Sequence, residues 1–270
     1  MDNEKDNELF EHEREDFDYD EFFHGEDEDY EREKEQRKKN KTFITRIVGS
    51  LLVVALLVSG LTIWPQIINL PAIDFLASSA RLSQNEDVKH YKKAVVAIEH
   101  DQVKGTGFNV NAEGLIVTNE HVVNNAKRVK VHFKGGESYT GKVVYTDEQL
   151  DLAIVDIEGH ELPYLKISYE SKWKGEDSVI FIGNPLSFTQ IANKGEIIGN
   201  VLLEDHHRPV MMIKAPIYKG NSGSPVVNTD GEVIGVIFAT LRNPDVETDE
   251  IIGVATPATY LEPIIKEWEK

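Results

Sequence analysis

Three short runs of the chain contain residues that could together perform nucleophilic catalysis. One run leads to His121, one places Asp151 between two leucines, and one contains Ser222 among the residues Gly220-Asn221-Ser222-Gly223-Ser224-Pro225. A serine hydroxyl is a weak nucleophile near neutral pH, so it needs a base such as imidazole within hydrogen-bond reach. The imidazole needs an acceptor for its other nitrogen, and a carboxylate flanked by apolar residues suits that role. We therefore predict Ser222 as nucleophile, His121 as base and Asp151 as the residue that orients the base.

The glycines beside Ser222 favour the same chemistry. Attack on a carbonyl creates an oxyanion, which backbone N–H groups must meet. Gly220 permits the backbone angles and the close approach of substrate that such a loop needs. Taken singly, each run has an ordinary structural explanation. Their occurrence in the order His, Asp, Ser, each at the end of an expected strand, favours a catalytic one.

Short β-branched and apolar runs, separated by turn residues, predict an all-β fold from residue 95 onward. The expected strands are 95–98, 107–110, 115–118, 129–133, 142–145, 152–157, 178–182, 196–201, 210–214, 225–228, 233–239 and 251–256. The break near 158–175 divides them into two sets, which we interpret as two six-stranded barrels at 91–158 and 175–258. Helical periodicity predicts a C-terminal helix at 259–268, with Leu261, Ile264, Ile265 and Trp268 on one face.

These features resemble the trypsin-like serine peptidases, and most of all their HtrA (DegP-like) branch. The resemblance spans about residues 90–260 and is carried by Thr118-Asn119-Glu120-His121-Val122-Val123, Asp151-Leu152-Ala153-Ile154-Val155, Ile182-Gly183-Asn184-Pro185-Leu186 and the Ser222 run. Two positions depart from the family pattern. Ser224 stands where the family usually has glycine, and the loop 214–219 differs from the usual sequence before the nucleophile.

The resemblance implies a double β-barrel with the active site in the cleft between the barrels. It implies His121, Asp151 and Ser222 as the triad, and the amides of Gly220 and Ser222 as the oxyanion hole. It also places Ile217, Ile237, Phe238 and Ala239 around the pocket for the residue before the scissile bond. Because Pro216 stands where trypsin-like specificity would need a carboxylate, we expect a small aliphatic residue there. For each of these pocket positions, a plain barrel-core role remains the alternative.

Relatives in this branch also imply two expectations about assembly. Many form trimers through N-terminal residues, so residues 70–90 could support a homotrimer. Most carry one or two PDZ domains after the peptidase, but this chain ends at Lys270, about 48 residues after Ser222. We therefore expect no PDZ domain here.

The N-terminal part has a different composition. Residues 1–40 hold 18 Asp and Glu against 7 Lys and Arg, which predicts a disordered acidic tail over 1–42. Residues 47–64 contain no charge and would form a helix about 27 Å long, so we predict a transmembrane helix at 43–64. Basic residues lie just before this span, which predicts a cytoplasmic N-terminus and an extracytoplasmic peptidase domain at 91–270. Residues 65–90 are expected to be a linker.

Several classes of function and site are disfavoured. The chain has a net charge of −18, which argues against a nucleic-acid partner. It has no cysteine, which excludes disulfides and thiolate chemistry. His206 and His207 lie in an expected hairpin turn and lack the convergent donors of a metal site, so we expect neither a metal nor a cofactor.

Two functions fit these observations. The first is a membrane-anchored serine endopeptidase that hydrolyses unfolded or misfolded proteins outside the cytoplasm. The second is a membrane-bound sensor whose peptidase-like external domain signals through a cytoplasmic partner of the acidic tail, which carries aromatic residues among its acids.

Overall fold

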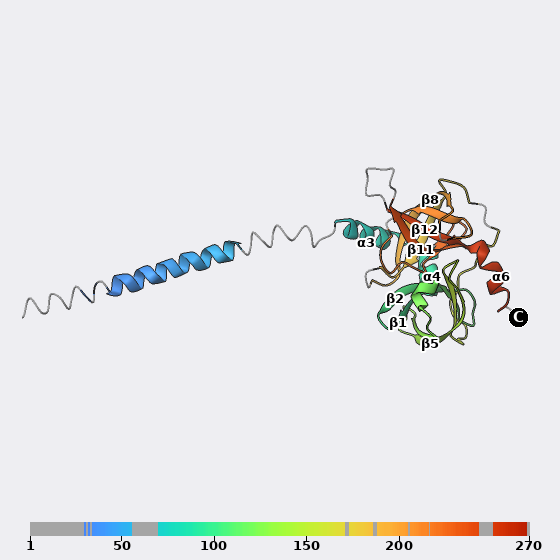
Figure 1. The fold of residues 1–270 in the computed structure, drawn as a ribbon, viewed down its shortest axis with the longest axis horizontal. Helices are drawn as coiled ribbons and strands as arrows, with labels where there is room; N and C mark the ends of the chain where they lie inside the picture. Colours follow the sequence, from blue (N-terminus) through green and yellow to red (C-terminus); the bar gives the residue numbers. More distant parts are fainter. Residues whose placement is uncertain are drawn as a thin grey trace, which may run out of the picture. The chain divides into compact units, whose positions relative to one another are not determined.

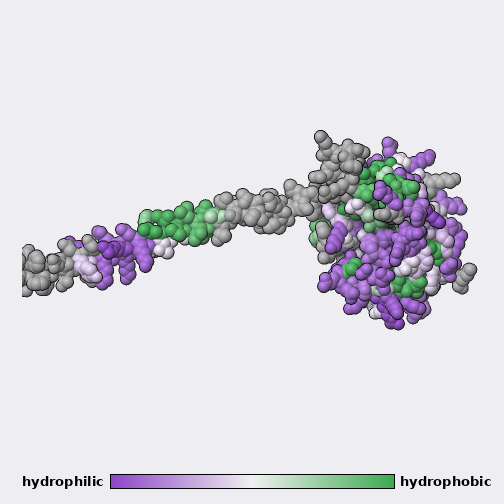
Figure 2. Space-filling model, viewed as in Figure 1, coloured by the Kyte–Doolittle hydropathy of each residue, from purple (hydrophilic) through white to green (hydrophobic). Residues whose placement is uncertain are grey.

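The structure, a computed structural model, describes residues 30, 32, 34–55, 70–170, 173–185, 188–204, 206–215, 217–242 and 251–268 (Figure 1). The chain divides into two units between residues 69 and 70. In the first unit, residues 34–55 are helical. Figure 2 shows hydrophilic residues over the first part of this helix and hydrophobic residues over the last part.

The expected membrane span at 43–64 falls only partly within this helix, because residues 56–64 lie outside the described residues. No helix in the described part of the chain has both the length and the apolar character needed to cross a membrane. The large apolar side chains of 43–55 are nevertheless exposed, and Leu51 and Leu52 are 63% and 61% accessible.

The second unit contains two closed six-stranded β-barrels, which confirms the predicted fold class (Figure 1). Barrel one has the strand order β1-β2-β3-β6-β5-β4, and barrel two has the order β10-β11-β12-β9-β8-β7. The strands of barrel one are β1 Val95–His100, β2 Val103–Asn109, β3 Leu115–Thr118, β4 Arg128–His132, β5 Ser138–Asp147 and β6 Leu152–Asp156. Those of barrel two are β7 Ser178–Gly183, β8 Ile191–Val201, β9 Val210–Lys214, β10 Pro225–Val227, β11 Val233–Arg242 and β12 Ile251–Pro257.

The central strands bury both of their faces. In β6, Ala153 and Val155 point into the core of barrel one. Leu152 and Ile154 point the other way, into a cluster that also holds Ile182 of barrel two. This follows from the alternation of side chains along a strand. One apolar cluster therefore fixes the two barrels against each other.

The C-terminal helix is shorter than predicted. The expected helix at 259–268 is instead a 3₁₀ turn, η2 Ala258–Tyr260, followed by α6 Glu262–Ile265. Pro263 explains why the helix is interrupted. Because proline lacks an N–H, it is tolerated only in the first turn of a helix, and Pro263 lies in the first turn of α6. Leu261, Ile264 and Ile265 are buried as expected, but Trp268 is 41% exposed.

The segment expected as a linker at 65–90 includes two helices, α3 Leu70–Leu82 and α4 Glu86–Ala94. Pro71 stands in the first turn of α3, where a proline costs no helical hydrogen bond. Phe75 of α3 is buried and packs edge-on against Tyr218, with ring centroids 4.8 Å apart. Helix α3 therefore packs against the loop that precedes Ser222. A short helix, α5 Glu120–Val123, follows β3.

Candidate active site

His121 and Asp151 meet because their strands pair. His121 lies in α5, just after β3, and Asp151 immediately precedes β6. In the β3–β6 ladder Thr118 stands opposite Ala153, so the following and preceding residues come together. His121 Nδ1 lies 2.7 Å from Asp151 Oδ2, and the His121 backbone N–H donates to Oδ1 at 3.0 Å. The structure thus brings these two predicted residues together.

The backbone of Asp151 is held in an unusual conformation. Its φ is 47°, in the left-handed region that few non-glycine residues adopt. The Asn119 side chain donates to its carbonyl at 2.7 Å, and Thr256 of β12 donates to the carbonyl of Leu150 at 2.9 Å. Hydrogen bonds from both barrels therefore fix the carboxylate that orients His121.

This environment shifts two pKa values. The hydrogen bond to Asp151 raises the pKa of His121, and the negative charges of Asp151 and Glu120 add to that rise, whereas burial opposes it. Burial raises the pKa of Glu120, and repulsion from Asp151 acts in the same direction. His121 is 47% exposed and Asp151 only 15%, so the base faces solvent and the carboxylate does not.

Ser222 lies in the loop that joins β9 to β10. Its hydroxyl donates to the carbonyl of Phe238 at 3.5 Å, longer than an ordinary O–H···O hydrogen bond. The structure shows no hydrogen bond between Ser222 Oγ and His121, both of which it describes. Of the three predicted residues, His121 and Asp151 are therefore joined by a hydrogen bond, whereas the Ser222 hydroxyl points towards β11.

The loop around Ser222 presents two backbone N–H groups. The amide of Asn221 donates to Tyr218 O, and the amide of Gly223 donates to Ile237 O. Within the described residues the amides of Gly220 and Ser222 have no acceptor, so both are available to an oxyanion. Gly220 has a φ of 100°, and a Cβ there would lie 2.5 Å from Asn184 O, so only glycine fits.

Thr106 of β2 holds this loop from the other barrel. Its backbone N–H donates to Ser222 O at 2.8 Å, and its hydroxyl donates to Gly220 O at 2.7 Å. The backbone N–H of Asn184 donates to the Thr106 hydroxyl at 2.9 Å, and Gln190 N–H donates to Asn184 Oδ1 at 2.9 Å. Because these bonds fix the carbonyl of Gly220, they fix the orientation of the loop that carries the two free amides.

Sequence reasoning missed this role of Thr106 and Gln190. Asn184 was noted only within the run Ile182-Gly183-Asn184-Pro185-Leu186. The only hint at Thr106 was its position between Gly105 and Gly107 in an expected strand. A small polar residue there lets another chain segment approach the backbone closely.

The residues expected around the substrate pocket lie in two apolar clusters. Ile217 and Ile237 are 5% and 1% exposed and belong to the core of barrel two. Phe238 is 9% exposed and stacks on the ring of His206, with centroids 5.0 Å apart. Ala239 is half-buried beside Phe238. Pro216 lies outside the described residues.

The described residues include no group of three or more His, Cys, Asp or Glu side chains that could hold a metal ion. His206 stacks on Phe238. Both ring nitrogens of His206 are buried and have no hydrogen-bond partner among the described residues. His207 is exposed.

The chain is similar to known peptidases over this region. Residues 105–236, which contain His121, Asp151 and Ser222, match the family described as "Trypsin-like peptidase domain". A "Probable periplasmic serine endoprotease DegP-like" of Chlamydia trachomatis is 36% identical over 141 residues, which is 51% of this chain and 28% of that protein. "Serine protease HTRA1A" of Danio rerio is 38% identical over 157 residues, 55% of this chain and 33% of that protein.

A solved structure agrees with these matches. The serine endoprotease from Yersinia pestis aligns with a TM-score of 0.59 and 28% identity, covering 67% of this chain and 64% of that one. The alignments span a third or less of the length of the curated relatives named above. Over residues 105–236 the chain thus matches a trypsin-like peptidase domain, and DegP-like and HTRA serine endoproteases are among the proteins similar to it.

Proposed function

We propose that the protein is a serine endopeptidase whose catalytic residues are Ser222, His121 and Asp151. The observation that carries this proposal is the pair formed by His121 Nδ1 and Asp151 Oδ2 at 2.7 Å, beside a serine loop with two free amides. Since Asp151 accepts from Nδ1, the Nε2 atom of neutral His121 has a free lone pair. That atom is the acceptor for the serine proton.

Catalysis requires one movement from the described state. The Ser222 hydroxyl turns from the carbonyl of Phe238 towards His121 Nε2, and its weak 3.5 Å bond makes this rotation inexpensive. Ser222 Oγ then attacks the substrate carbonyl while His121 takes the proton. The amides of Gly220 and Ser222 stabilise the oxyanion, and His121 returns the proton to the leaving amine. Water hydrolyses the acyl-enzyme by the same steps.

The substrates we propose are unfolded or misfolded polypeptides outside the cytoplasm. An extended chain can enter the cleft, whereas a folded one cannot present its backbone to Ser222. Ile217, Ile237, Phe238 and Ala239 would surround the residue before the scissile bond. These neighbours are apolar, so a small aliphatic side chain fits better than a charged one.

The same proposal assigns residues 43–64 to a membrane. Apolar side chains exposed over 43–55 would gain most from leaving water, and the basic residues from Arg37 to Arg46 would remain on the cytoplasmic side. The Chlamydia trachomatis relative is named as periplasmic, which is compatible with an extracytoplasmic peptidase domain.

Membrane extraction tests this location. The full chain should sediment with membranes and resist extraction by alkaline carbonate, because a spanning helix is held by burial and not by charge. Deleting residues 47–64 should release the chain into the soluble fraction, whereas deleting residues 10–27, a segment of equal length, should not. Carbonate extraction of the unaltered chain would contradict the proposal.

Ser222→Ala should lower cleavage of β-casein by at least about 10⁴-fold, because no nucleophile remains. Ser178→Ala changes an exposed serine outside the cleft and serves as the matched control, with activity retained. The measurement is release of casein fragments from the full chain over time. Equal rates for the two variants would show that Ser222 is not the nucleophile.

Thr106→Val keeps the backbone bond to Ser222 but removes the hydroxyl that donates to Gly220. We expect kcat to fall about 10- to 100-fold, part of the loss seen when an oxyanion donor is removed, with KM changed less than about twofold. Thr106→Ser, which restores the hydroxyl, should recover most of kcat. A loss of stability alone would lower the amount of active enzyme in both variants and would not separate valine from serine.

The pH dependence of kcat/KM tests the His121–Asp151 pair. Since the pKa of His121 is raised above 6.5, activity should fall with decreasing pH through a midpoint above 6.5, as the base becomes protonated. Asp151→Asn should lower kcat by about 10³- to 10⁴-fold and move the midpoint to lower pH. Glu148→Gln, a nearby exposed acid, is the control and should leave both unchanged. A wild-type midpoint at or below 6.5 would contradict the assigned pair.

A further inference from the structure

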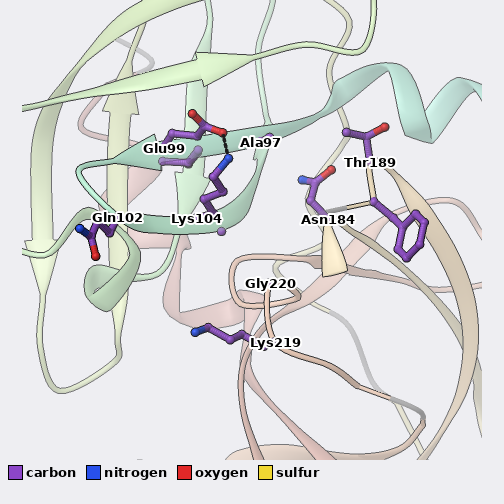
Figure 3. A pocket seen from close by; sticks show the side chains of 11 residues that line it. Ala97, Glu99, Gln102, Lys104, Asn184, Thr189, Lys219 and Gly220 are labelled. Carbon is purple, nitrogen blue, oxygen red and sulfur yellow. Dashed lines mark hydrogen bonds and ion pairs between the residues drawn. The ribbon is translucent and has the colours of Figure 1, made fainter. Parts of the chain in front are cut away.

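A cavity of about 370 Å³ opens beside Gly220 (Figure 3). Three groups of residues line it: the hairpin of β1 and β2, the residues Asn184, Phe188 and Thr189, and the pair Lys219-Gly220. Its floor includes the buried side chain of Ile98, and the phenyl ring of Phe188, which is 44% exposed, forms one side. The cavity therefore joins both barrels at the loop that carries the oxyanion amides.

The position of Gly220 places this cavity relative to a bound peptide. The carbonyl under attack would lie between Ser222 Oγ and the amide of Gly220. Ser222 Oγ faces β11, where the pocket for the residue before the scissile bond is expected. None of Ile217, Ile237, Phe238 or Ala239 lines the cavity. Consider a peptide whose residues before the scissile bond lie along β11. Its residues after the scissile bond must then run away from that strand, past Gly220 and into the cavity.

The charged side chains that line the cavity do not all neutralise one another. Glu99 and Lys104 neutralise each other, with Lys104 Nζ 2.7 Å from Glu99 Oε1. Lys219 is exposed, and its ammonium group has no ion pair or hydrogen bond within the described residues. In Figure 3 its side chain extends away from Thr189, towards the side of the cavity that carries Gln102. One cation thus remains available at the mouth of the cavity.

We infer that this cavity binds the residues that follow the scissile bond, and that Lys219 selects a carboxylate among them. This inference rests on the proposed endopeptidase activity and adds its specificity on the leaving-group side. The carboxylate would come from an Asp or Glu side chain or from the C-terminus of a short peptide. The exposed ring of Phe188 would contact the apolar stem of such a residue, while Lys219 and Gln102 meet its oxygens.

The expected effect is modest, because Lys219 is partly solvated. A single exposed ion pair would favour Glu over Gln by about three- to fivefold in kcat/KM. The preference should shrink when NaCl is raised from about 0.05 to 0.5 M, since salt screens charges separated by more than a few ångströms. A preference that arises from shape alone would not depend on salt.

The experiment uses quenched fluorescent peptides that differ at one position and the full chain as enzyme. Glu and Gln are compared at each of the three positions after the cut, and mass spectrometry of the products confirms the cut. We expect faster cleavage of the Glu peptide than of the Gln peptide at one or more of these positions. We expect no such preference when Glu and Gln are compared at the third position before the cut. Further peptides end at the position that shows the preference, with either a free C-terminal carboxylate or a C-terminal amide. Comparing their rates distinguishes recognition of the C-terminal carboxylate from recognition of a carboxylate side chain.

Two variants assign the preference to its residue. Lys219→Met should reduce the Glu-to-Gln ratio to about one, whereas Lys174→Met, which removes an exposed lysine outside the cavity, should leave the ratio unchanged. Lys104→Met removes the lysine partner of Glu99 and should also lower the ratio. Equal rates for Glu and Gln at all three positions, or a preference that survives Lys219→Met, would overturn the inference.

A binding measurement separates this inference from the proposed activity. Fluorescence anisotropy of the Glu and Gln peptides with the full Ser222→Ala chain reports binding without turnover. Tighter binding of the Glu peptide that is lost in the additional Lys219→Met variant supports the cavity even if the wild-type chain cleaves no peptide. Equal binding of both peptides, with no cleavage, would overturn both proposals.

Discussion

Thr106 joins the two barrels at the point where the reaction would occur. Its backbone N–H donates to the carbonyl of Ser222, and its hydroxyl donates to the carbonyl of Gly220. The hydroxyl can do so with correct geometry because Asn184 of the second barrel donates to it from behind. A Cβ on Gly223 would collide with the Thr106 carbonyl, so the loop can approach β2 only with glycine at that position. The direction of the two free amides, and with it any stabilisation of an oxyanion, depends on this contact between barrels.

The other half of the site depends on pairing within barrel one. His121 and Asp151 are 30 residues apart but adjoin because β3 and β6 are neighbours in the barrel. Asp151 adopts a left-handed backbone conformation there. The Asn119 side chain donates a hydrogen bond to the Asp151 carbonyl, and the Thr256 hydroxyl donates one to the Leu150 carbonyl, and these bonds hold the segment. The proposed base thus belongs to one barrel and the proposed nucleophile to the other. The apolar cluster that includes Leu152, Ile154 and Ile182 determines the distance between them.

The sequence was sufficient for the fold class, and it named the His121 and Asp151 that lie together, but it could not predict the conformation of the Ser222 side chain. Short β-branched and apolar runs located each of the strands in the described residues, but β2, β5 and β8 begin four or five residues earlier than predicted. In β8, Asn193, Lys194 and Gly195 hide the apolar pattern. The two prolines show why the helix bounds differed from the prediction. Pro71 lies in the first turn of α3, where it is tolerated, and Pro263 lies in the first turn of α6, so that one helix does not run from 259 to 268. The Thr106 contact could not be predicted, because it depends on how the barrels dock. Nor could the hydroxyl of Ser222 be placed, since its rotamer is decided by the carbonyl of Phe238 in β11.

We propose that Ser222 becomes a nucleophile only within this assembled site. The most direct measurement is reaction of the folded full chain with a fluorophosphonate, followed by tandem mass spectrometry of the labelled peptide. We expect one adduct, on Ser222. It should be lost when His121 is replaced by alanine, because the base is then absent, and when the chain is unfolded, because the arrangement of the free amides is then lost as well. Failure to label Ser222 in the folded chain, or labelling that persists equally after unfolding, would contradict it.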